Sequence, residues 1–240
     1  MLASDLVDAS VVAVDQALIP ALGPPQSRHR KRRRGADLQA GWGYSEHHGW
    51  VYGYSMEVVV AATNDSIVVP LLGSVGPGNT NASGSFLVQV DRLPSETRDV
   101  LADRAYDTNA CGEAVEYDSD DEPTDRHLVC PLIGRAGKPK VGRQQRRGTR
   151  ERSRQRRLKR LAFFESPEGQ RLYSQRAKTV EPFIEWFKQK FDLHAHVWHR
   201  GLDNNRTQMM GALCAYQLLV RYHHHLGGTN ACIQWILDRL

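Results

Sequence analysis

Two short apolar segments that each run into an aspartate constrain the fold of this chain more than any other feature. Residues 11–15 read Val-Val-Ala-Val-Asp, and residues 100–103 read Val-Leu-Ala-Asp. Each segment has the composition of a buried strand, and an open α/β sheet gathers the residues at its strand ends along one rim. We therefore expect Asp15 and Asp103 to converge there, although they lie far apart in the sequence.

A third acid, Glu181, lies further along in a basic stretch with helical periodicity. The chain carries 32 Lys and Arg against 27 Asp and Glu, a formal net charge of +5. Carboxylates that converge on a basic protein indicate metal-dependent chemistry on phosphate, because hard divalent cations prefer oxygen ligands. Each acid also has an ordinary interpretation. Asp15 and Asp103 can be strand-end residues that accept backbone hydrogen bonds, and Glu181 can belong to a solvated helix face.

The length and composition predict one globular domain over residues 1–240. The hydrophobic content of 40% is enough for one full core. The sequence has no run of about 18 apolar residues, and its amino terminus lacks the layout of a signal peptide. Four cysteines without a CxxC pair favour reduced thiols. Together these features predict a soluble, cytoplasmic protein.

Turn residues divide the chain into a strand-rich first part and a helical last part. The expected strands cover residues 10–15, 50–63, 67–72, 100–103 and 127–133. The second and third of these flank a short turn and should pair antiparallel. A loop is expected over 73–85, where Gly, Asn and Ser are abundant. Helical spacing of apolar residues predicts helices over 85–93, over 108–116, from 167 onward and over 205–225.

Three polar residues accompany Glu181 on its predicted helix. Tyr173 and Arg176 precede it, and Lys188 follows seven residues later, about two helical turns. That spacing brings Glu181 and Lys188 to one face, where a carboxylate can hold a metal while the donors bind phosphate oxygens. A surface helix with assorted polar groups is the ordinary alternative.

These motifs resemble the catalytic domain of bacterial insertion-sequence DDE transposases. The similarity spans residues 11–222 and rests on the motifs around Asp103 and Glu181 and on Ala-Leu-x-Ala-Tyr-Gln-Leu-Leu at 212–219. The segment around Asp103 reads Val-Leu-Ala-Asp-Arg-Ala-Tyr-Asp. The resemblance implies an α/β, ribonuclease-H-like fold. Its mixed five-stranded sheet would be antiparallel in the first three strands, parallel thereafter and flanked by helices.

The resemblance also implies roles for individual residues. Asp15, Asp103 and Glu181 would be the catalytic, metal-binding triad, while Tyr173, Arg176 and Lys188 would contact DNA phosphate. The gap between Arg176 and Glu181 is one residue longer than the family pattern, which rotates Arg176 by about 100° on an ideal helix. Lys178 is therefore an alternative for that role.

The implied activity is two-metal phosphoryl transfer. Asp15 would bridge two Mg²⁺ ions about 4 Å apart, with Asp103 and Glu181 on either side, and Mn²⁺ would be able to substitute. One ion would activate water or a DNA 3′-hydroxyl, and the other would stabilise the leaving oxygen. The implied reaction nicks the transposon ends and transfers them into target DNA, with a homodimer as the expected DNA-bound form.

Two segments concentrate the positive charge. Residues 28–34 predict a basic loop, and more than half of residues 143–160 are Arg or Lys. Such dense like charge repels itself when unpaired, so the second segment is either a flexible arm or a helix stabilised by a polyanion. Solvated loops are the alternative for both segments, and a mimic of a nuclear localisation signal is a further one for the first. We expect phosphate contacts from Arg32, Arg33, Arg146, Arg147 and Arg150.

The sequence is also compatible with two alternatives to an active transposase. Only 14 residues precede Asp15, so we expect the amino-terminal DNA-binding domain of such enzymes to be absent. A truncated, catalytically silent relic that binds nucleic acid is one alternative, and a ribonuclease-H-like nuclease without strand transfer is another. Residues 223–225 are three histidines that diverge on a helix, so we expect a polar helix end rather than a metal site.

Overall fold

The computed structural model describes residues 7–27, 34–46, 48–62, 68–132, 147–228 and 236, except for the side chains of 147–150. The strands of its sheet are β1 (Val11–Pro20), β2 (Gly41–Ser45), β3 (Gly49–Ala61), β4 (Pro70–Pro77), β5 (Asp99–Leu101) and β6 (His127–Val129). The α-helices are α1 (Ala82–Leu87), α2 (Asn109–Glu116), α3 (Arg147–Glu165), α4 (Pro167–Lys190) and α5 (Leu202–His225). Two 3₁₀ turns, η2 (Val90–Arg92) and η3 (Arg104–Tyr106), flank β5.

The sheet is mixed and curled. Its strands run in the order β2-β3-β1-β5-β6, and β4 also pairs with β3. The pairs that involve β3 are antiparallel, whereas β1, β5 and β6 are mutually parallel. This arrangement is consistent with a ribonuclease-H-like fold. The antiparallel pairing of the second and third expected strands is confirmed by β3 and β4.

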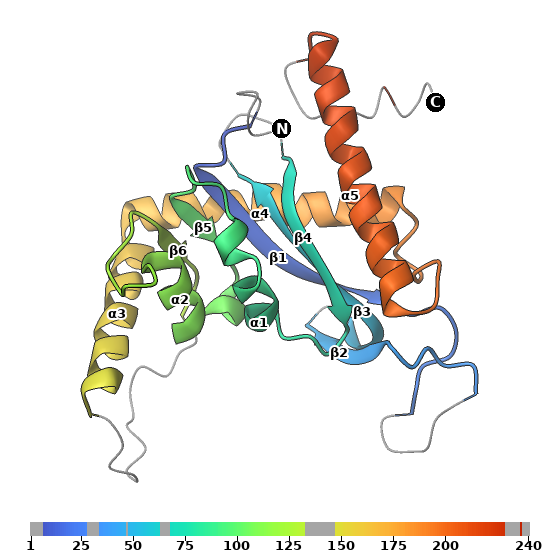
Figure 1. Ribbon diagram of the computed structural model, residues 1–240, viewed down its shortest axis with the longest axis horizontal. Helices are drawn as coiled ribbons and strands as arrows, with labels where there is room; N and C mark the ends of the chain where they lie inside the picture. The colour runs from blue at the N-terminus through green and yellow to red at the C-terminus, as the bar shows by residue number, and fades with distance from the viewer. Residues whose placement is uncertain are drawn as a thin grey trace.

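Helices cover both faces of the sheet, because successive residues of a strand point to opposite sides. Along β1, Ala13 and Ile19 enter a core that α4 and α5 complete, while Val12 and Val14 enter a second core with α1 and α2. In Figure 1, α4 runs across the sheet, α5 rises beside β4, and α3 descends along the β6 edge. No described helix is long and apolar enough to cross a membrane.

The strand boundaries correct several expectations. The first strand does not end at Asp15 but continues to Pro20, because residues 16–20 keep their pairing with β3. Asp15 therefore lies in the middle of a strand. β5 ends at Leu101, two residues before Asp103, which caps η3 by accepting a 2.7 Å hydrogen bond from the Ala105 N–H.

The expected loop over 73–85 is wrong at both ends. β4 extends through Gly73 to Pro77, since its backbone pairs with Tyr54–Val58 of β3. α1 begins at Ala82, earlier than expected, because the Asn81 side chain accepts a hydrogen bond from the Ser83 N–H and caps the helix.

The strand β2 was not predicted from the sequence. Its sequence, Gly-Trp-Gly-Tyr-Ser, resembles a loop and becomes a strand by pairing with β3.

Residues 147–160 of the Arg-rich segment lie in helix α3, and the described arginines among them bind acids of the protein itself. Burying a cation is costly unless an acid pairs with it, and α2 and the neighbouring loops supply those acids. A polyanion is thus not what neutralises this part of α3. The ion pairs are Arg152–Asp121, Arg156–Asp121 at 2.6 Å, Arg156–Glu113 at 3.9 Å, Arg157–Asp107 at 2.6 Å, Arg160–Glu116 at 3.8 Å and, within α3 itself, Arg154–Glu151 at 3.8 Å.

Candidate functional site

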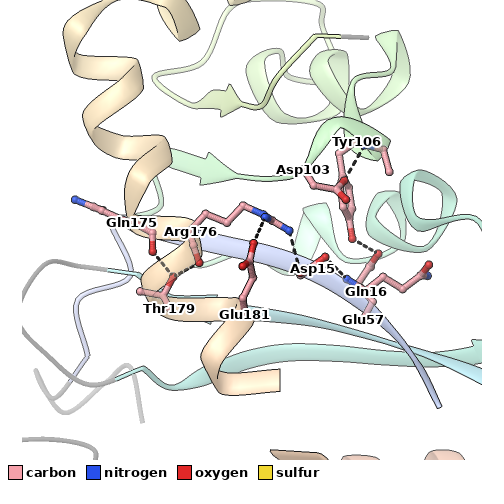
Figure 2. Close-up of polar contacts among 10 residues, drawn as sticks. Asp15, Gln16, Glu57, Asp103, Tyr106, Gln175, Arg176, Thr179 and Glu181 are labelled. Carbon is pink, nitrogen blue, oxygen red and sulfur yellow. Dashed lines mark hydrogen bonds and ion pairs between the residues drawn. The ribbon is translucent and has the colours of Figure 1, made fainter. Parts of the chain in front are cut away.

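Parallel pairing of β1 and β5 brings the two aspartates together. Ala13 is the register partner of Leu101, and both side chains enter the core under α4. Asp15 and Asp103 follow these two partners by two residues, and Asp103 lies close enough to Asp15 to raise its pKa by repulsion (Figure 2). The convergence expected from the sequence occurs, although it involves the middle of one strand rather than two strand ends.

Helix α4 supplies the third acid and a cation. It begins at Pro167 after the Ser166 cap, which accepts a hydrogen bond from the Gly169 N–H, and it packs on β1. From this helix, Arg176 reaches two acids at once. Its Nη2 lies 2.9 Å from Asp15 Oδ2, and its Nη1 lies 2.6 Å from Glu181 Oε1 (Figure 2). The guanidinium thus joins the first acid to the third.

The environment of Asp15 disfavours its charge despite this cation. Burial raises the pKa of Asp15 to about 6, and Asp103 and Glu181 also raise it by repulsion. Arg176 and a 2.8 Å hydrogen bond from the Gln16 N–H act in the opposite direction. The surroundings of Asp15 therefore favour its protonated form, chiefly because the carboxyl is buried.

A fourth acid, Glu57, lies behind Asp15 and was not predicted. It sits on β3 opposite Gln16, is 1% exposed, and has a pKa raised to about 7, chiefly by burial. The Tyr106 hydroxyl donates to it at 2.9 Å, and the Gln89 amide donates at 2.5 Å. The available signal was a single charged residue inside the apolar run Met-Glu-Val-Val-Val, since such a residue is buried when both strand faces are covered.

Comparison with known protein families agrees with this geometry. A family model described as "Transposase DDE domain" matches residues 6–218, nearly the whole chain. The chain belongs to the transposase DDE domain family. No curated protein and no solved structure gives a match.

The other motif residues of the transposase domain lie at different distances from the acids. Tyr173 is half-buried, packs edge-on against Phe164, and has a pKa raised by burial and then lowered in part by Arg176. Lys188 lies two turns beyond Glu181, but its ammonium binds Glu185 at 2.8 Å and not Glu181. Lys178, the alternative to Arg176, is exposed.

The expected contacts from the basic segments cannot be placed. Arg32, Arg33 and Arg146 lie outside the described residues, and the side chains of Arg147 and Arg150 are not described. Their roles at DNA stay predictions. The histidines at 223–225 end α5, as expected, although His223 itself is buried.

The acids fit a divalent cation in kind. All the oxygen donors are carboxylates, the ligands that Mg²⁺ and Mn²⁺ prefer. Among the described residues, no three His, Cys, Asp or Glu side chains lie close enough together to hold a metal ion. Arg176 supplies the positive charge between Asp15 and Glu181 instead. Its position shows where a cation can neutralise these two carboxylates.

Proposed function

We propose that this transposase domain nicks DNA at transposon ends and transfers those ends into target DNA, with Asp15, Asp103 and Glu181 as the catalytic acids. The observation that carries the proposal is that Arg176 binds both Asp15 and Glu181, while Asp103 lies close enough to Asp15 to raise its pKa by repulsion. Membership of the transposase DDE domain family supports the same conclusion.

The three acids would hold two Mg²⁺ ions, for which Mn²⁺ can substitute. When bound, the metal supplies Lewis-acid chemistry that activates the attacking oxygen and stabilises the leaving oxygen of a phosphodiester. The chain contributes the fixed positions of the carboxylates. Asp103 is oriented by its hydrogen bond from the Ala105 N–H, and Asp15 is oriented by the one from the Gln16 N–H.

Cationic and hydroxyl groups along α4 would orient the DNA. Tyr173 and Arg176 lie on the α4 turns before Glu181, and Lys188 lies two turns beyond it. We assign phosphate contacts to these three residues and to the basic segments that contain Arg32 and Arg146. Phosphate contacts of this kind are insensitive to sequence and weaken with salt.

Partners and location follow from the reaction. Both ends of an element must be cut and joined, so we propose that two copies of the chain act together on DNA as a homodimer. We also propose that the reaction takes place in the cytoplasm, on chromosomal or plasmid DNA, with residues 1–240 acting as one catalytic domain.

A nicking assay tests the proposal. Supercoiled plasmid that carries the element's terminal sequences is incubated with the protein and Mg²⁺ or Mn²⁺. We expect nicking by wild type and none by Asp15→Asn, Asp103→Asn or Glu181→Gln. Glu168→Gln, which removes an exposed acid from the first turn of the same helix, is the matched control and should nick normally.

The outcomes separate three classes of protein. DNA binding without nicking in either metal would identify a silent relic and refute the enzymatic proposal. Nicking by wild type without joining of a pre-cleaved end would identify a simple nuclease. Nicking and joining that both require the three acids would establish the transposase.

A further inference from the structure

Arg176 occupies an unusual position for a residue of a phosphate-binding motif. Its side chain is only 10% exposed, and its two terminal nitrogens each bind a different acid of the triad. Of those acids, the Asp15 side chain is 19% exposed and the Glu181 side chain is 49% exposed. The guanidinium therefore points into the acidic site, and it has to leave Asp15 and Glu181 before it can contact a DNA phosphate.

The spacing along α4 makes this contact specific to arginine. Arg176 and Glu181 are five residues apart, which does not place them on one helix face. The long arginine stem spans the difference, and the planar fork of the guanidinium presents two donors to two carboxylates. A lysine ammonium in the same place has no planar pair of donors with which to bind both carboxylates.

The ion pairs of Arg176 with Asp15 and Glu181 are weakly held. Arg176 Nε is buried and has no hydrogen-bond partner among the described residues, so the side chain is held at its tip alone. Glu181 is half exposed, which leaves water access to one of the two bonds. Buried ion pairs with an unsatisfied donor gain little over solvent, because the cost of desolvation offsets much of the attraction.

A divalent cation and this guanidinium require the same oxygens. Asp15 Oδ2 and Glu181 Oε1 accept the hydrogen bonds of Arg176, and the same carboxylates are the expected metal ligands. We propose that Arg176 is a resident counter-cation that holds Asp15 and Glu181 together without metal and is displaced when divalent metal enters. This inference rests on the proposed function, since it assumes that the three acids bind metal.

Metal affinity tests the inference without using activity. Mg²⁺ and Mn²⁺ binding is measured by calorimetry on wild type, Arg176→Gln and Arg176→Lys in the full chain. We expect Arg176→Gln to bind metal about tenfold more tightly or better, because the metal no longer breaks charge-assisted hydrogen bonds of that strength. Arg176→Lys should fall between the two. Arg171→Gln removes an exposed arginine from the same helix and should leave the affinity unchanged.

A measurement on the wild-type side chain covers the case in which Arg176→Gln does not fold. In protein labelled with ¹⁵N at arginine Nε, the Arg176 signal is identified by its absence from the Arg176→Lys spectrum. Metal should shift this signal and leave that of Arg171 in place. An unmoved Arg176 signal at saturating metal overturns the inference.

The calorimetric outcomes distinguish the inference from the function on which it depends. Equal or weaker metal binding by Arg176→Gln, with normal binding by wild type, overturns the inference alone and leaves the metal site intact. No metal binding by any of the folded proteins overturns both.

Discussion

Replacing Glu57 with glutamine should change how the stability of the domain depends on pH. Burial raises the pKa of Glu57 from 4.5 to about 7 in the folded protein, while hydrogen bonds from Tyr106 and Gln89 offset part of that rise. The unfolded chain releases the same proton near pH 4.5. The folded state therefore favours the protonated form, and its stabilisation is complete at low pH and is lost as the pH rises to about 7.

The expected size follows from the two pKa values. Raising a pKa from 4.5 to about 7 corresponds to about 3 kcal/mol of unfolding free energy, at roughly 1.4 kcal/mol for each pH unit. Urea denaturation of wild type and Glu57→Gln, at several pH values between about 4.5 and 8, measures this difference. Wild type should lose about 3 kcal/mol relative to Glu57→Gln across that range, with no further relative loss above it.

An exposed glutamate provides the control for Glu57→Gln. Glu96→Gln replaces an exposed glutamate and should give a pH profile parallel to that of wild type. Parallel profiles for wild type and Glu57→Gln would refute the reasoning, because they would show that Glu57 keeps an ordinary proton affinity despite its burial. A reversed difference, with wild type gaining stability as the pH rises, would refute it equally.

Two further predictions concern the arginines of α3. Gly112→Ala should cost about 1–3 kcal/mol in chemical denaturation, because the new Cβ would overlap Arg160 Nη1 and force that side chain away. Gly211→Ala in α5, where a Cβ meets nothing within 4 Å, should be neutral or stabilising, and an equal effect of the two changes would contradict the packing argument. Arg157→Ala should cost about 3 kcal/mol by depriving the fully buried Asp107 carboxylate of its cation. The exposed Arg154→Ala is its matched control, and equal stability of these two variants would show that the Arg157–Asp107 pair contributes nothing.

Local patterns in the sequence were sufficient for much of the fold. Runs of β-branched residues identified β1, β3 and β5, and helical spacing identified α4 and α5, because these signals depend on neighbours within a few residues. β2 and the second half of β4 escaped prediction for the opposite reason. Their glycine-rich sequences form strands only because β3 offers its backbone beside them.

In the Arg-rich segment, too, the sequence predicted part of the structure and tertiary contacts decided the rest. Arginine density left two alternatives, a flexible arm or a helix stabilised by a polyanion, and residues 147–160 lie in helix α3. Arg154 pairs with Glu151 of its own helix, but the acids that pair with Arg152, Arg156, Arg157 and Arg160 come from chain segments at least 30 residues earlier, at Asp107, Glu113, Glu116 and Asp121. Nothing in the composition of residues 143–160 distinguishes an internal acid from a DNA phosphate as the partner.

At the candidate site, the sequence alone identified the acids, and folding established their relations. Asp15, Asp103 and Glu181 were recognisable because strand pattern and motif spacing are properties of short segments. That Arg176 joins two of them, and that Glu57 lies buried behind Asp15, required the pairing of β1 with β3 and β5 and the packing of α4 on β1. Electrostatic energies change steeply over a few ångströms, so only the positions of residues brought together from distant segments determine which charge is neutralised and which proton is retained.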